Sequence, residues 1–436
     1  LGWLLTSQSA LHWAIERMSA AVGGRLVVEG VQRTGIAALV AERVRYTDPT
    51  LKLDVRDASI EVRFVSLLRG RVVVRSLSAQ NVEVETMQAR DDEPLELPQS
   101  LTLPLPIEVQ SLRVGRLAFG PQGEPIVLAD IDGAWAYDGT RHAVTLRTLQ
   151  TPWAAVQGRI ELGASRPFPI EGGLSIVPSM AGMGTTYVAL AGELNAMGVG
   201  AVAKAYDTPI TAKASVHAFG TSTLAWIDAK ASGFELRSLD ASLPRARLDA
   251  SARARIERDG TISGNLDIVN RSPGLPATER LPVVRMQSRF AGDGQRWTLS
   301  DLVLDGGPAG RLTGQARINA TTVDAQLRAH ALNLVGVHES LYPTALAGPI
   351  RVIRSNGKID FEVDLREAST QIVLVGAYEG DRIDLSQARW NTPAGQVEVQ
   401  GAVRLSEHTD FEASGRLVGF DPARVGAFPP AILNAR

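Results

Sequence analysis

The feature that most constrains this chain is a short repeated pattern in which apolar residues and one glycine occupy every second position. Its clearest copy is Leu312-Thr-Gly314-Gln-Ala316-Arg-Ile318, in which polar residues fill the intervening positions. A period of two residues indicates a β-strand with one apolar face. The same frame recurs at 22–28, 68–74, 131–137, 156–162, 170–176, 190–196, 262–268, 346–352 and 399–405. A shuffled chain of this composition would give roughly three or four copies, so the repeat predicts a mainly β protein.

Composition favours an elongated body over a compact one. Apolar residues make up 44% of the 436 residues, but only 5% are aromatic, so few large side chains are present to fill a deep core. A sheet that curls along its length can bury one alternating face without such residues. We therefore expect an elongated, curled antiparallel β-sheet with a hydrophobic interior.

Charge and cysteine content exclude several classes of protein. The 45 basic and 47 acidic residues nearly cancel, and no basic cluster is interleaved with aromatic residues, so a nucleic-acid partner is not expected. The absence of cysteine excludes disulfides and thiolate metal sites. No run approaches the roughly twenty apolar residues of a membrane-spanning helix. The apolar start, Leu1-Gly-Trp3-Leu4-Leu5, is expected to be the trimmed end of a membrane anchor.

Four segments are predicted along the chain. Thr6 or Ser7 can cap a short helix in which Leu11, Ile15 and Met18 share one face, which gives an N-terminal helix within 1–23. Strand patterns fill 24–87. An acidic, proline-rich linker is predicted at 88–106, because prolines lack the N–H groups that a sheet ladder requires. Strands resume from 107 to 436, where a longer repeat of about 85 residues is visible and the pattern is expected to continue beyond the chain.

No arrangement of residues predicts catalysis, a metal site or a cofactor. The six histidines have no metal-ligand spacing, and neither a nucleophile elbow nor a phosphate-binding loop occurs. Four carboxylates in the last third could meet in space, but charges on the outer face of a strand are usually solvated; they are Glu362, Asp364, Asp381 and Asp384. We predict a protein that is not an enzyme.

Alternation assigns side chains to the two faces of the predicted sheet, because successive residues of a strand point to opposite sides. The residues predicted to line the apolar groove are Val156, Ile160, Leu162, Leu312, Ile318, Val399, Val403 and Leu405. The residues predicted to face outward are Arg159, Glu161, Arg317, Glu398 and Arg404.

Several segments resemble the TamB family of AsmA-like proteins, which is related to bridge-like lipid transfer proteins. The resemblance rests on Ser7 to Leu11, on Gly30 to Gly35, on Leu105-Pro106-Ile107-Glu-Val109, and above all on Gly419-Phe420-Asp421-Pro422-Ala423-Arg424 with Phe428-Pro429. It implies a taco-shaped β-sheet with a hydrophobic groove, in the periplasm of a Gram-negative bacterium, tethered to the inner membrane by an N-terminal anchor.

The resemblance also implies partners. Phospholipid would pass through the groove towards the outer membrane, and an Omp85-type barrel resembling TamA would be the outer-membrane partner. Nothing in the chain resembles the region that engages the barrel, so no residue is assigned to that contact. Two alternatives stay open: a scaffold for outer-membrane protein or autotransporter assembly, which would use a sheet edge, and a polysaccharide enzyme, which would need convergent carboxylates.

Overall fold

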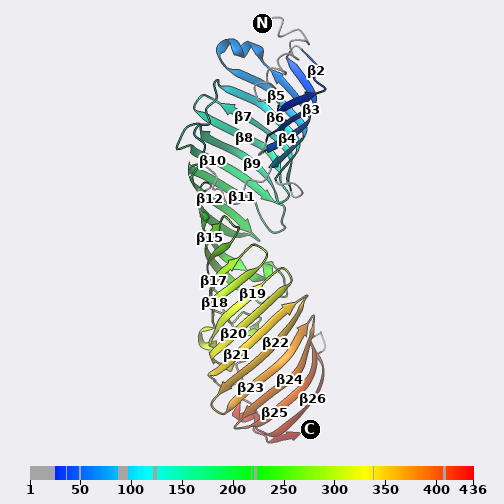
Figure 1. Cartoon of the computed structure of the whole chain (residues 1–436). Helices are drawn as coiled ribbons and strands as arrows, with labels where there is room; N and C mark the ends of the chain where they lie inside the picture. The colour runs from blue at the N-terminus through cyan, green and yellow to red at the C-terminus, as the bar shows by residue number, and fades with distance from the viewer. Residues whose placement is uncertain are drawn as a thin grey trace. The chain divides into compact units, whose positions relative to one another are not determined.

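The computed structural model describes residues 25–35, 37–48, 51–86, 97–120, 125–217, 219, 223–336, 338–405 and 409–436. These residues are mostly β-strand and include six short 3-10 turns but no α-helix (Figure 1). The 27 described strands belong to one sheet, which confirms the predicted mainly β fold. The helix predicted within 1–23 lies outside the described residues.

The chain divides into two compact units. The first comprises the residues up to Asp207 together with Thr211–Ala225, and the second comprises Thr208–Ile210 together with Trp226–Arg436. Two strands therefore contain residues of both units: β13 (Thr208–Val216) and β14 (Thr223–Glu235). The segment limits predicted from the sequence, at 24, 88 and 107, stay predictions.

The first unit is a sheet in which β1 and β2 both pair with β3, and each strand from β3 to β12 pairs with the next. Every pair is antiparallel except β5–β6, where Val72 lies opposite Ile107 in a parallel ladder. A parallel pair requires the chain to return, between its two strands, to the end at which the first strand began. The elements are β1 (Leu26–Glu29), β2 (Gln32–Arg33), β3 (Ala38–Thr47), β4 (Leu51–Val62), η1 (Phe64–Arg69), β5 (Val72–Thr86), β6 (Ile107–Gly120), β7 (Ile126–Tyr137), β8 (Arg141–Gln150), β9 (Ala154–Gly163), β10 (Pro169–Pro178), β11 (Thr186–Glu193) and β12 (Ala196–Ala205).

The second unit is an antiparallel meander in which each strand from β15 to β27 pairs with the next (Figure 1). Its strands are β15 (Arg247–Glu257), β16 (Ile262–Asn270), β17 (Arg285–Gly292), β18 (Trp297–Asp305), β19 (Arg311–Ile318), β20 (Thr322–Leu332), β21 (Leu346–Ser355), β22 (Lys358–Glu367), β23 (Thr370–Glu379), β24 (Arg382–Thr392), β25 (Gly395–Leu405), β26 (Thr409–Phe420) and β27 (Leu433–Ala435). Its 3-10 turns are η2 (Leu236–Ser238), η3 (Pro276–Thr278), η4 (Gly307–Ala309), η5 (Leu334–Gly336) and η6 (Pro422–Arg424).

Exposure alternates along the strands as the sequence pattern predicts. In β10, Ile170 and Leu174 are half-buried, whereas Glu171 and Val177 are exposed. The half-buried residues share the apolar face, so the sheet curls toward that face and partly covers it. We call this the inner face and the opposite, charged side the outer face.

Many of the fully buried side chains lie near strand ends, although Ser288, Leu302 and Ala316 are buried within strands. In the second unit, Ala329, Leu346 and Leu365 form a cluster at the ends of β20–β22, and Leu334 of the turn η5 packs against it. In the first unit, Phe168 and Ala164 are buried in the turn between β9 and β10. Between these margins the inner face stays half-open, which is the geometry of a trough.

Candidate functional site

The inner face of the second unit is a continuous apolar surface. One row of directly opposed residues crosses every strand from β15 to β26 and contains only apolar residues and glycine. The row is Ala254, Gly264, Phe290, Leu299, Ala316, Ala325, Val352, Phe361, Gly376, Leu385, Gly401 and Ala413. Because opposed residues of neighbouring strands project on the same face, this register forms an uninterrupted apolar strip.

The inner face of the first unit has the same construction. One row runs from β4 to β12 through Val62, Val74, Val109, Trp135, Val144, Ile160, Gly172, Leu190 and Val199. A second row, from β3 to β12, contains Leu39, Ile60, Leu77, Leu112, Gly133, Leu146, Gly158, Leu174, Val188 and Ala201. Neither row includes a charged residue, so each unit presents an apolar trough floor.

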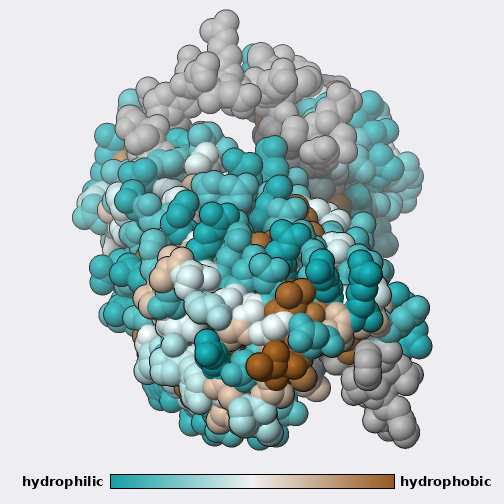
Figure 2. All heavy atoms as spheres, turned by 90° about the horizontal axis from the view of Figure 1, so that it is seen from below, coloured by the Kyte–Doolittle hydropathy of each residue, from teal (hydrophilic) through white to brown (hydrophobic). Residues whose placement is uncertain are grey.

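The outer face differs sharply from the inner face. The outer row beside the apolar row of the second unit includes the charged residues Arg255, Arg317, Asp324, Asp360, Asp384 and Glu412. Hydrophilic residues likewise predominate on the surface seen in Figure 2, and hydrophobic residues form only small groups there. Water therefore faces one side of the sheet, and the apolar side is left for a nonpolar occupant.

The structure brings most of the predicted lining residues onto this inner face. Ile160 is a member of the first-unit row, and the remaining described ones share the face of a neighbouring row and are half-buried; they are Val156, Leu162, Leu312, Ile318, Val399 and Val403. The side chain of Leu405 lies outside the described part. The five residues predicted to face outward, Arg159, Glu161, Arg317, Glu398 and Arg404, alternate with the lining residues; all are exposed except Glu161, which is half-buried. Contact of the lining residues with a ligand stays a prediction.

Glycines bring the inner-face backbones unusually close together. A Cβ atom added to Gly314 would lie 2.1 Å from the Gln326 carbonyl oxygen, and one added to Gly264 would lie 2.0 Å from that of Arg253. Real side chains never approach a carbonyl so closely. The glycine of the repeated frame is therefore a geometric requirement of the closely approaching strands.

Aromatic rings cover several of these glycines, a feature that the sequence pattern did not reveal. The Phe361 ring lies over Gly376, the Phe290 ring lies over Gly264, and the Trp297 ring lies over Gly292. Each pair is an opposed pair of neighbouring strands. Because the ring occupies the space that a side chain would fill, the trough floor stays apolar at each glycine.

One margin of the first-unit trough is closed by the segment Leu97–Leu101, which we call the strap. The Arg166 guanidinium donates hydrogen bonds to the Leu97 and Pro98 carbonyls at 2.8 and 3.1 Å. The Leu101 N–H donates to the Ala164 carbonyl at 2.9 Å. These contacts hold the strap against the turn that contains the buried residue Phe168.

His142 connects the strap to the inner face. Its Nε2 lies 2.8 Å from the Leu101 carbonyl oxygen, and since a carbonyl can only accept, the imidazole N–H is the donor. The same ring stacks on Tyr137 with centroids 4.6 Å apart. The sequence indicated only that His142 was not a metal ligand; its place depends on the contact with Leu101, which is 41 residues away in the chain.

Ion pairs across the outer face hold neighbouring strands in register. Arg43 donates to the buried carboxylate of Asp54 from the adjacent strand, with 3.0 Å between Nε and Oδ1. The hydrogen bond from Arg43 lowers the pKa of Asp54 below its ordinary value of 3.8. Arg285 makes a similar two-pronged contact with Asp267, at 2.8 and 2.6 Å, and lowers the pKa of that carboxyl in the same way.

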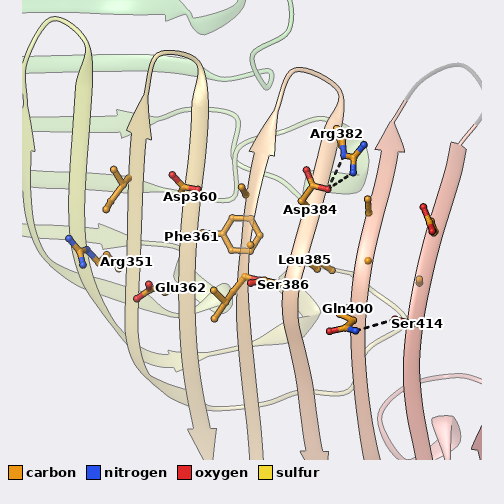
Figure 3. A pocket seen from close by; sticks show the side chains of 18 residues that line it. Arg351, Asp360, Phe361, Glu362, Arg382, Asp384, Leu385, Ser386, Gln400 and Ser414 are labelled. Carbon is orange, nitrogen blue, oxygen red and sulfur yellow. Dashed lines mark hydrogen bonds and ion pairs between the residues drawn. The ribbon is translucent and has the colours of Figure 1, made fainter. Parts of the chain in front are cut away.

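Strands β21–β26 also border a shallow hollow of about 1050 Å³, which is lined by inner-row residues such as Phe361 and Leu385 together with polar side chains (Figure 3). Its labelled lining residues come from successive strands, and Arg382 pairs with Asp384 at 2.8 Å while Gln400 donates to Ser414 at 3.3 Å. Most of the polar side chains in this hollow are exposed, including Glu362 and Glu412. It is therefore a solvated concavity of the twisted sheet and lacks the enclosed apolar lining of a small-molecule site.

The described residues do not assemble reactive groups. Of the four carboxylates considered from the sequence, Asp364 pairs with Arg366 at 2.8 Å, Asp384 pairs with Arg382, and Asp381 and Glu362 are exposed. The hydrogen bond from Arg366 lowers the pKa of Asp364, which keeps it ionised. Within the described ranges no group of three His, Cys, Asp or Glu side chains could hold a metal ion. None of the helical segments in those ranges is long and apolar enough to span a membrane.

Fold and site together define a class: an open, curled antiparallel β-sheet protein whose inner face is a register-matched apolar trough and whose outer face is charged. Residues 1–159 match the family model described as TamB, N-terminal domain, which agrees with the resemblance found in the sequence. No curated protein and no solved structure matches the chain. The matched segment covers the first 159 of the 436 residues.

Proposed function

We propose that this chain is part of a periplasmic conduit that carries phospholipid between the inner and outer membranes, with the acyl chains lying along the inner face. The observation that carries the proposal is the apolar row from Ala254 to Ala413, which crosses every strand from β15 to β26 without a charged side chain. An acyl chain needs apolar contact along its length and no directional partner. A continuous strip supplies such contact at any point along the row.

The half-open state of the inner face supports a pathway over a sealed core. Ile160 and Val403 are half-buried although they lie in the middle of the apolar pattern. A core residue that only stabilised the fold would be expected to be buried like Leu346. In an aqueous compartment an exposed strip of this kind is costly unless it binds something nonpolar.

The alternative role, as a scaffold for outer-membrane protein or autotransporter assembly with an Omp85-type barrel, would use a strand edge. The apolar face would then serve only to stabilise the sheet. The match to the TamB N-terminal domain is compatible with either role. The inner-face rows are the observation that favours the conduit, because β-augmentation requires backbone hydrogen-bonding groups and makes no use of a continuous apolar strip.

The test places one carboxylate on the trough floor. The variants Ile160→Asp and Val403→Asp are expected to stay folded, with a free energy of unfolding lowered by about 1–3 kcal/mol, because a charge in a half-open trough can still be hydrated. A passing acyl chain, in contrast, would have to desolvate that charge. Matched controls are Gln157→Asp and Gln396→Asp, which put the same carboxylate on the exposed outer face of the same strands.

Four measurements distinguish the outcomes: cellular abundance, thermal melting, copurified lipid detected by extraction and mass spectrometry, and outer-membrane integrity in cells whose related proteins have been deleted. Folded inner-face variants without bound lipid or function, beside normal controls, are the expected result. Normal lipid content and function in folded Ile160→Asp would refute the pathway. Loss of folded protein would identify the inner face as a sealed core.

A further inference from the structure

The margin of the first unit opposite the strap is built from three turns that we call the rim: 151–154, 179–185 and 206–207. Hydrogen bonds join them in series. The Ser179 N–H donates to the Trp153 carbonyl at 2.7 Å, and the Tyr206 N–H donates to the Gly182 carbonyl at 2.6 Å. The rim is therefore one connected ledge along the ends of β9–β12.

Large apolar side chains are exposed on this ledge. Met180 is 72% exposed and Trp153 is 66% exposed. On the outer face just behind the rim, Tyr187 is 64% exposed and its opposed partner Val202 is 55% exposed, with Val177 on the neighbouring strand also exposed. A cluster of this size on a soluble surface marks an interaction site.

The hairpin turns of the second unit show that such side chains are not a requirement of the fold. The turns after β15, β17, β19 and β21 are formed by polar residues, glycine and one alanine, and three of them are held by the side-chain acceptors Asp259, Asp293 and Asn319. These short hairpin turns therefore do not require exposed aromatic or methionine side chains, although Tyr342 and Phe428 are exposed elsewhere in the second unit.

Charge near the rim is positive and unpaired. Lys204 precedes the last rim turn and Lys213 follows it, both are exposed, and neither forms an ion pair with any described residue. Among the other described lysines, Lys52 and Lys358 form ion pairs, whereas the exposed Lys230 does not. Asp207 is the single carboxylate within the three turns.

We propose that the rim is a membrane-contact surface for an anionic phospholipid bilayer. Tryptophan, tyrosine and methionine would enter the interfacial layer, where their apolar bodies are buried and their polar ends stay hydrated. Lys204 and Lys213 would face the headgroup phosphates. Because β9 begins at Ala154 and leads directly to Val156 and Ile160, this contact brings lipid to one end of the inner face. Only this delivery of lipid to the inner face rests on the proposed function; the membrane contact does not.

The experiment is flotation with vesicles of phosphatidylglycerol and phosphatidylcholine, and with vesicles of phosphatidylcholine alone. The variant Trp153→Ser, Met180→Ser, Tyr187→Ser is expected to bind the mixed vesicles at least tenfold more weakly than the unmodified chain. The matched control Tyr342→Ser, Phe428→Ser removes two exposed aromatic side chains of the second unit and is expected to bind normally. The double variant Lys204→Gln, Lys213→Gln is expected to bind the mixed vesicles several-fold more weakly and the phosphatidylcholine vesicles unchanged. High salt is also expected to weaken binding of the unmodified chain to the mixed vesicles.

Vesicle binding and lipid content separate this proposal from the proposed function. The rim variant is expected to fold and to keep copurified lipid, whereas Ile160→Asp is expected to lose copurified lipid and still bind vesicles. Failure of the unmodified chain to bind vesicles, or equal binding by the rim variant and the control, would overturn the rim proposal. If either of these results occurred, loss of copurified lipid from Ile160→Asp would still support the lipid pathway along the inner face.

Discussion

Two adjacent glycines on β10 offer a direct test of how the trough is shaped. Gly172 belongs to the inner-face row, and Gly173 is its neighbour on the outer face. A Cβ atom on Gly172 would lie 2.6 Å from the Arg159 carbonyl oxygen and 3.0 Å from the Ile160 Cα. A Cβ atom on Gly173 would have its nearest neighbour, the Val188 carbonyl oxygen, at 3.9 Å.

Gly172→Ala should therefore be strongly destabilising and Gly173→Ala should not. The clash at Gly172 involves backbone atoms, so it can be relieved only by moving β9 away from β10. Overpacking of this kind costs about 1–3 kcal/mol, and stretching one ladder hydrogen bond adds about 1 kcal/mol. Alanine at Gly173 meets no clash and reduces the entropy of the unfolded chain, so it should be neutral or stabilise by up to about 1 kcal/mol.

Thermal unfolding followed by circular dichroism measures the difference. A loss of 2–4 kcal/mol in a unit of this size corresponds to a fall in Tm of about 4–16 °C. Hydrogen exchange should show the loss of protection concentrated in β9 and β10. Equal melting temperatures for the two variants would refute the assignment of Gly172 to a close backbone approach.

Three further predictions address charge, the strap and the body of the protein. Asp54→Asn should lower the free energy of unfolding at pH 7 by about 1–3 kcal/mol. Because Arg43 lowers the folded-state pKa of Asp54 below 3.8, the stability that the ion pair contributes is present above that pH and is lost as the pH falls further. Equal effects of the substitution at pH 7 and pH 2 would contradict the pairing. Ser100 and Ser165 are bridge partners and the chain has no cysteine. The double variant Ser100→Cys, Ser165→Cys should therefore form a disulfide on oxidation and raise the free energy of unfolding by about 2–4 kcal/mol. If mass spectrometry still found both thiols free after oxidation, the strap contact would be excluded. The elongated body predicted from the sequence, on the order of 140 Å against roughly 45 Å for a compact globule, is tested by small-angle scattering, and a compact profile would refute it.

Alternation in the sequence separates the two faces of each strand but does not specify which residues become neighbours within a face. Ile160, Leu312 and Val399 were assigned to the inner face from alternation alone, and the structure places them there. The Asp421-Pro422-Ala423-Arg424 segment singled out by the resemblance forms the turn η6, in which the Asp421 side chain accepts a hydrogen bond from the Ala423 N–H. Both features depend on residues close together in the chain.

Contacts between residues far apart in the chain determine the features that the sequence pattern did not predict. The position of Phe361 over Gly376, of His142 beneath Leu101, and of Arg166 against Leu97 each requires contacts between segments that no local pattern specifies. The parallel β5–β6 pair is a further case, because the proline-rich sequence of 88–106 indicated an extended segment and not its destination. Bulges such as the one between Leu299 and Leu302 also shift the register in a way that alternation cannot reveal.

By itself, then, the sequence determined that this protein is a chain of short strands with one apolar and one charged face. That result follows from the two-residue period of a strand, which holds whatever the strand pairs with. Only the tertiary structure decided that the apolar residues join into unbroken rows, that one margin of the first unit carries the strap and the other the rim, and that glycines set the closest approach of the strands. Those properties depend on register and on the return path of the chain, and both are fixed by contacts between residues far apart in sequence.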